Sequence, residues 1–179
     1  MQKTTIKNTK ILVLAAFMTA LSVVIGWVCK TYLTFGDGSV RVTFENIPVI
    51  LSGIWLGPVL GCLVGASADV VSALLSGYSI NPIITLGAAS VGLVSGIVFK
   101  YVPTDKKIGW FKIWLSVFSA HCIGSVIIKS FGLYLYGYAV LMWIRIPLYI
   151  GIALAETYII YILYNNKGVS SGIERLRRK

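Results

Sequence analysis

Five ionisable residues lie inside long apolar stretches of the sequence: Asp69, His121, Lys129, Arg145 and Glu156. A charged group in the hydrocarbon interior of a membrane is costly, so such residues generally pair with one another or mark a functional site. An ammonium or guanidinium group would bind an anion, and a carboxylate such as that of Asp69 would accept paired hydrogen bonds from an amino-pyrimidine edge. These residues indicate a buried polar site that binds a small molecule.

The spacing of these residues groups several of them. His121, Ser125 and Lys129 recur at four-residue intervals, which puts them on one face of a helix. A similar stripe in the next apolar stretch consists of Arg145, Tyr149, Ile152 and Glu156. Two polar stripes on neighbouring helices predict a polar cavity between them.

Each ionisable residue also has a structural alternative. Asp69 would form an internal ion pair with Lys129 or Arg145. His121 would be neutral and hydrogen-bonded between helices. Glu156 is better explained by a hydrogen bond or ion pair within the protein than by contact with a ligand.

The basic residues indicate how the chain crosses a membrane. Twelve of the sixteen Lys and Arg residues flank alternate apolar stretches, and the positive-inside rule assigns these to the cytoplasm. They are Lys3, Lys7, Lys10, Lys100, Lys106, Lys107, Lys112, Lys167, Arg175, Arg177, Arg178 and Lys179. Lys30, Arg41, Lys129 and Arg145 remain near the other side. Lys30 would extend to the membrane interface, and the other three are candidates for binding an anionic group.

Aromatic residues occur in the segments expected on this outer side. They are Phe35, Phe44, Tyr78, Tyr134, Tyr136 and Tyr138. Such residues form an interfacial belt in many membrane proteins, and they would equally stack on a planar ligand. With Arg41, Lys129 and Arg145 they would suit a flat heteroaromatic molecule that carries an anionic tail.

The composition is typical of a membrane protein. Of the 179 residues, 57% are hydrophobic and 12% are charged, whereas soluble domains have about 25% charged residues. The net charge of +10 is better explained by anionic lipid than by nucleic acid, because the charges flank apolar stretches and no nucleic-acid motif occurs. No catalytic set, metal-ligand spacing or cofactor fingerprint is present, so we expect neither an enzyme nor a metalloprotein.

The fold class predicted is an all-α integral membrane protein, a single domain over residues 1–179. Its six spans cover about residues 10–33, 47–56, 59–75, 82–102, 111–133 and 139–163, and a cytoplasmic tail follows at 165–179. Gly57-Pro58 divides the second apolar region, which makes the number of spans even and leaves both basic termini in the cytoplasm. The 47–56 span is only about 15 Å long, so protein must shield it or the bilayer must thin around it.

Two local patterns add detail to this bundle. Residues 40–45 alternate apolar and polar side chains, which indicates an extended or hairpin-like segment in the first outer loop. Gly61 and Gly65 form a GxxxG motif, as do Gly92 and Gly96, and this motif lets helices approach closely. Neither pattern identifies a ligand.

Residues 41–96 resemble a known family. They carry a phenylalanine followed four residues later by a proline (Phe44 and Pro48), then LGP, a GASAD motif that ends at Asp69, and an NPIITLG motif that begins at Asn81. In these elements the chain is similar to the membrane-embedded substrate-binding (S) components of energy-coupling factor (ECF) vitamin transporters, and most similar to the folate branch. The layout resembles the family over most of the chain, and the specific motifs cover about a third of it.

The resemblance implies a high-affinity folate-binding protein that is not an enzyme and has no cofactor of its own. Folate would be captured from outside and passed to a transmembrane coupling subunit and two ATPase subunits, which alone would use ATP. Ala16 and Ala20 match an alanine motif that packs against the coupling subunit in the family. Another vitamin, first riboflavin and then thiamine, is the alternative, and a small membrane enzyme is a more distant one.

The resemblance also places the ligand in the outer half of the bundle, beneath the first and third loops. The predicted substrate-binding residues are Asp69, Asn81, Tyr78, Arg41, Lys129, Arg145, Phe35, Tyr134 and His121. Of these, Asp69 and Asn81 would bind the pterin edge, the three aromatic residues would stack on the rings, and the three basic residues would bind the glutamate carboxylates.

Overall fold

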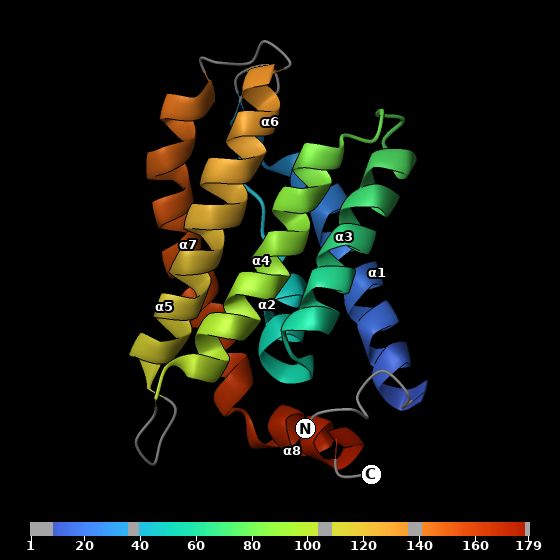
Figure 1. Ribbon diagram of the computed structural model, residues 1–179, viewed down its shortest axis with the longest axis vertical. Helices are drawn as coiled ribbons and strands as arrows, with labels where there is room; N and C mark the ends of the chain where they lie inside the picture. The colour runs from blue at the N-terminus through green and yellow to red at the C-terminus, as the bar shows by residue number, and fades with distance from the viewer. Residues whose placement is uncertain (1–8, 36–39, 104–108, 136–140, 178–179) are drawn as a thin grey trace.

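The computed structural model describes residues 9–35, 40–103, 109–135 and 141–177, which form an elongated helical bundle (Figure 1). Its α-helices are α1 (Thr9–Tyr32), α2 (Asn46–Leu56), α3 (Pro58–Leu75), α4 (Pro82–Tyr101), α5 (Trp110–Ala120), α6 (Lys129–Leu135), α7 (Leu141–Asn165) and α8 (Lys167–Arg177). A π-helix, η1 (His121–Ile128), joins α5 to α6, so that these three elements form one continuous rod. Two short strands are β1 (Thr34–Phe35) and β2 (Val40–Arg41).

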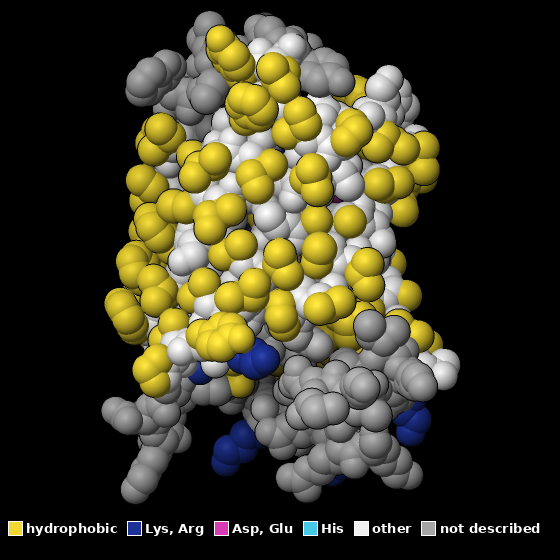
Figure 2. Space-filling view, viewed as in Figure 1, with side chains coloured by type: hydrophobic (Ala, Val, Ile, Leu, Met, Phe, Trp, Pro, Cys, Tyr) yellow, Lys and Arg dark blue, Asp and Glu magenta, His cyan; other side chains and the backbone are white. Residues whose placement is uncertain are grey.

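Five helical segments in the described part of the chain are long and apolar enough to cross a membrane: α1, α3, α4, the α5–η1–α6 rod and α7. Their outer surfaces expose large apolar side chains such as Phe17 (59% exposed) and Trp27 (61% exposed). Figure 2 shows hydrophobic side chains spread over the described part of the face in view, with Lys and Arg near its lower end. This surface suits lipid rather than water, and the expectation of an all-helical membrane protein is confirmed.

Helix α2 is the short apolar helix expected after the first loop. All of its 11 residues are buried, and it is too short to be a candidate span. It ends at Leu56 and is followed by Gly57, whose φ of 100° favours glycine. Pro58 then begins α3. The predicted break is therefore present, and protein shields the short helix from lipid. The described residues thus contain five candidate spans and α2, in place of the six spans predicted.

Backbone contacts join α2, α3 and α4. A β-carbon added to Gly61 would lie 2.6 Å from the Cα of Gly53 and from the carbonyl oxygen of Gly92. One added to Gly92 would overlap the Gly61 carbonyl group, and one added to Gly65 would overlap the Ala88 carbonyl group. This is the close approach that the GxxxG motifs indicated.

We expect Gly92→Ala to lower the free energy of unfolding by about 1–3 kcal/mol, because the added methyl group must push α3 and α4 apart. Gly151→Ala on α7 is the matched control, since a β-carbon there meets nothing within 4 Å. Titration of both purified variants with SDS in mixed micelles measures the difference. An unfolding midpoint for Gly92→Ala equal to that of the control would contradict the close contact.

The first loop contains a paired segment. Thr34 pairs with Arg41 and Phe35 with Val40, in the antiparallel sense. Of residues 40–45, for which an extended or hairpin-like segment was predicted, Val40 and Arg41 form this pairing and residues 42–45 lie outside the strand. This pairing returns the chain to the end of α1 before it enters α2.

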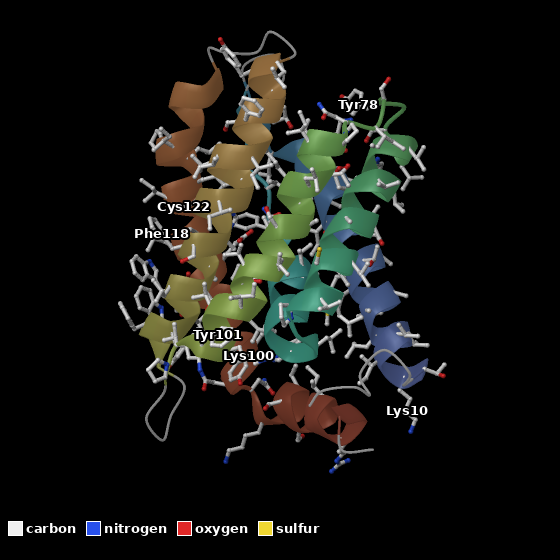
Figure 3. All side chains as sticks on the ribbon, viewed as in Figure 1. Lys10, Tyr78, Lys100, Tyr101, Phe118 and Cys122 are labelled. Carbon is white, nitrogen blue, oxygen red and sulfur yellow. The ribbon has the colours of Figure 1, made fainter. Side chains whose placement is uncertain are left out.

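The two ends of the bundle differ in character. Figure 3 shows Lys10 and Lys100 at one end, which we call the basal end, and Tyr78 at the other, which we call the loop end. Residues 167–177, expected to belong to a polar tail, form α8, which lies across the basal end (Figure 1).

Candidate ligand-binding site

The carboxylate of Asp69 is held by a neighbouring helix. Asp69 is half-buried on α3, and its Oδ2 accepts a hydrogen bond of 2.7 Å from the hydroxyl group of Thr85 on α4. The same hydroxyl oxygen lies 3.1 Å from the carbonyl oxygen of Asn81. Thr85 therefore brings the two residues predicted for the pterin edge to one place. Sequence reasoning missed Thr85, although it lies within the NPIITLG motif.

Asn81 also begins α4. Its Oδ1 accepts hydrogen bonds from the backbone N–H groups of Ile83 (3.0 Å) and Ile84 (3.4 Å), which is an N-cap. Pro82 occupies the first helical position. Because the side-chain oxygen accepts these capping hydrogen bonds, a ligand contact of Asn81 would have to come from its amide N–H₂ group.

Lys129 is a buried cation on the other side of α4. Lys129 is 8% exposed. Its side chain lies over Gly87, because a β-carbon added to Gly87 would lie 2.5 Å from Lys129 Cγ. Gly87 closes the NPIITLG motif and is a second residue that sequence reasoning missed. Among the side chains that the structure describes, neither Asp69 nor Lys129 forms a salt bridge. The buried carboxyl group of Glu156 is near enough to Lys129 for an electrostatic interaction, and a bound anion would give the ammonium group a direct partner.

His121 and Glu156 form a buried pair between η1 and α7. His121 Nε2 lies 2.6 Å from Glu156 Oε2, and His121 Nδ1 lies 3.2 Å from the hydroxyl oxygen of Ser125. The two side chains are 2% and 0% exposed, and the imidazole lies 5.4 Å from the ring of Tyr149. Both ring nitrogens are thus engaged by protein, as in the structural alternative for these residues. Direct contact between His121 and a ligand stays a prediction.

The helix changes its winding between the predicted residues His121 and Lys129. Residues 121–128 form a π-helix, which has more residues per turn than an α-helix and frequently occurs at functional sites. The predicted α-helical stripe is therefore altered, although His121 and Ser125 still contact each other. The π-helix ends directly before Lys129.

At the loop end, Lys30 and Tyr78 interact. The ammonium nitrogen of Lys30 lies 4.0 Å from the centroid of the Tyr78 ring, a cation–π contact that joins α1 to the α3–α4 loop. Lys30 thus meets an aromatic ring rather than only extending to the interface. Tyr78 is 61% exposed, as expected for a residue that an incoming ligand would reach. A small pocket beside Lys30 is lined in part by Glu45 and Ser72.

The remaining predicted residues are placed only in part. Tyr134 is 55% exposed near the end of α6. Phe35 and Arg41 lie in the paired strands and Arg145 lies in α7, but their side chains are outside the described residues. The residues around α4 therefore form the best-defined part of the candidate site.

A family model of the substrate-specific component of ECF transporters matches residues 10–167. The chain belongs to this family. It is therefore a multi-pass membrane protein, in keeping with its five candidate spans. S components bind a vitamin and work with an energising module, and they are not enzymes.

Two curated proteins are similar to this S component over part of their length. The folate transporter FolT of Clostridium novyi is 29% identical over 112 residues, which are 62% of this chain and 60% of that protein. An uncharacterized protein of Mycoplasma pneumoniae is 38% identical over 58 residues, which are 32% of this chain and 12% of that protein. The chain therefore spans less than two thirds of either relative.

A solved structure of the S component of a bacterial ECF transporter has the same fold. The TM-score is 0.64 at 20% sequence identity, and the match covers 87% of this chain and 94% of that one. On the first helix of this S component, Ala16 and Ala20 are both exposed. Their predicted contact with a coupling subunit is therefore sterically open, and it stays a prediction.

The His121–Glu156 pair should appear as an energetic coupling. We expect His121→Leu and Glu156→Leu to destabilise this S component singly, because each leaves a buried polar partner unsatisfied. The double variant should lose less than the sum of the two, by about 1–2 kcal/mol. Unfolding of the four proteins in SDS mixed micelles completes the cycle. Strictly additive losses would show that the two side chains do not interact.

Proposed function

We propose that this S component binds folate at the loop end, captures it from outside the cell and passes it to a separate ATP-driven module. The observation that carries the proposal is the arrangement of opposite charges on either side of α4. Asp69 is held at Thr85 and Lys129 lies over Gly87, yet the two do not neutralise each other. Folate would satisfy both, because it has an amino-pyrimidine edge that donates hydrogen bonds and a glutamate tail that carries carboxylates.

Two further considerations favour folate over other vitamins. The relative from Clostridium novyi is named as a folate transporter, and its similarity to this chain supports the same ligand. Thiamine is a cation and fits poorly beside a buried ammonium group. Riboflavin has the flat rings but no carboxylate for Lys129 to bind.

In the proposed complex, the pterin edge meets the Asp69 carboxylate and the amide N–H₂ group of Asn81. Tyr78, Phe35 and Tyr134 stack on the rings. The three residues that meet the glutamate carboxylates are Arg41, Lys129 and Arg145. His121 contributes to binding beside these three residues in the polar interior.

We place the basal end in the cytoplasm. Lys10, Lys100 and Lys112 lie at the basal ends of α1, α4 and α5, and positive charge at span ends favours the cytoplasmic side. Helix α2 then counts as the sixth helix of the bundle, and both termini lie in the cytoplasm. The loop end with Tyr78 accordingly faces outside, where the vitamin arrives.

Uptake in this proposal needs partner subunits. The transmembrane coupling subunit packs against Ala16 and Ala20 on the exposed face of α1, and two ATPase subunits hydrolyse ATP. The S component itself holds no cofactor and performs no catalysis. Its task is selective binding of the vitamin.

The first test is a ligand titration of the detergent-purified protein, followed by tryptophan fluorescence. We expect saturable folate binding with a dissociation constant in the nanomolar range and no response to riboflavin or thiamine. Tight binding of either other vitamin would keep the fold and overturn the choice of ligand. Absence of binding to all three would contradict the role as a vitamin-binding component.

The second test separates the two ends of the ligand. Lys129→Met should weaken folate by at least about tenfold, which corresponds to about 1.4 kcal/mol, while a pterin without the glutamate tail should bind as before. Thr85→Val is the contrasting variant: it releases Asp69, so it should weaken folate and the pterin alike. Isothermal titration of both ligands gives the comparison. An equal loss of both ligands in Lys129→Met would contradict the assignment of Lys129 to the tail.

A further inference from the structure

Helix α8 is a defined element that the proposed folate site does not use. Helix α7 ends at Asn165, and the backbone N–H of Asn166 donates to the carbonyl of Ile162 at 3.1 Å. The Asn166 side-chain oxygen then accepts from the N–H groups of Gly168 (2.9 Å) and Val169 (3.4 Å). One residue thus ends the last span and caps the next helix, so the direction of α8 is fixed by hydrogen bonds.

The inner face of α8 docks on the bundle. Val169 and Ile173 are four residues apart, which places them on one face of the helix. Ile173 is 8% exposed and belongs to the same apolar cluster as Ile11 of α1, and Val169 packs against this cluster. Helix α8 contacts the basal ends of both α1 and α7, and Figure 1 shows it lying across the base.

The outer face of α8 is polar and basic. Lys167, Ser171 and Arg175 are exposed, and residues 167–179 of the sequence contain five basic residues and one acidic residue. Lys10 and Lys100, also exposed, lie at the same end of the bundle (Figure 3). The positive charge of the described surface at this end therefore continues along α8.

The position of α8 along the membrane normal decides which partner these charges meet. In Figure 2 the apolar side wall of the bundle extends down to the level at which the first Lys and Arg side chains appear, and in Figure 1 helix α8 lies below the spanning helices. A bilayer adds a headgroup layer of roughly 5–8 Å to each side of its hydrocarbon core, and a helix with its side chains is about 10 Å across. A helix that lies flat directly below the apolar wall therefore occupies the headgroup layer.

We propose that α8 is an interfacial helix whose Lys167 and Arg175 bind the phosphate groups of anionic lipids. The small apolar face, Val169 and Ile173, holds the helix on the protein, and the charges at its two ends reach lipid at the edge of the bundle. Each basic residue near an anionic membrane surface contributes an attraction that corresponds to about a fivefold change in binding. Lipid binding would hold α8 in place across the basal ends of α1 and α7.

The test is hydrogen exchange of the α8 amides in the full-length protein, reconstituted in nanodiscs of phosphatidylcholine alone or mixed with phosphatidylglycerol. We expect exchange to be slower with phosphatidylglycerol at low salt and the difference to shrink at high salt. The slowing of exchange by phosphatidylglycerol should decrease about fivefold in Lys167→Gln and about fivefold in Arg175→Gln. In the double variant it should decrease by the product of these two factors. Ser171→Ala, an exposed neutral position on the same helix, is the matched control and should keep the full lipid effect.

Ile173→Ala separates docking from charge. It should speed exchange of α8 in both lipids by the same factor while leaving their ratio unchanged. Equal protection of wild-type α8 in both lipids, or a phosphatidylglycerol effect that survives in the double variant, would overturn the proposal. Protection that arises only when the coupling and ATPase subunits are added would also overturn it and would identify an acidic protein surface as the partner. None of these outcomes depends on which vitamin the loop end binds.

Discussion

The burial of α2 is the constraint on which the rest of the structure depends. A helix of 11 residues rises about 16 Å, roughly half of the hydrocarbon thickness. Its end groups would be unsatisfied in lipid, so the helix must be enclosed by protein. Gly53, Gly61 and Gly92 allow this enclosure, because their missing side chains let α2, α3 and α4 meet through their backbones. The position of α4 follows from this contact.

Helix α4 in turn sets the geometry of the candidate site. Its Thr85 holds the Asp69 carboxylate of α3, and its Gly87 accommodates the stem of Lys129 from α6. Both charged groups are thus positioned by one helix that is fixed at its far end by glycine contacts. The His121–Glu156 pair connects η1 to α7. The α5–η1–α6 rod, which includes Lys129, is therefore also held against the last span.

Features that depend on neighbouring residues in the chain could be predicted from the sequence. The break at Gly57, the paired first loop and the close helix contacts each have a local signature. Thr85 could not be assigned in advance, because its partner Asp69 lies 16 residues away on another helix. The π-winding of residues 121–128 has no local pattern, and α8 is held by the contact of Ile173 with residues far from it in the chain. Long-range packing decides these features.

Gly87 has a consequence for selectivity that reaches beyond packing. The absence of a side chain at Gly87 leaves the space that the Lys129 stem occupies beside α4. Among relatives of this chain, a larger residue at this position would divert the stem and leave the tail of the ligand without its cation. A pocket for acidic vitamins would then become one for neutral vitamins through a change in the scaffold alone. In the proposed site, selectivity would thus depend on a residue of the scaffold as well as on the residues that contact the ligand.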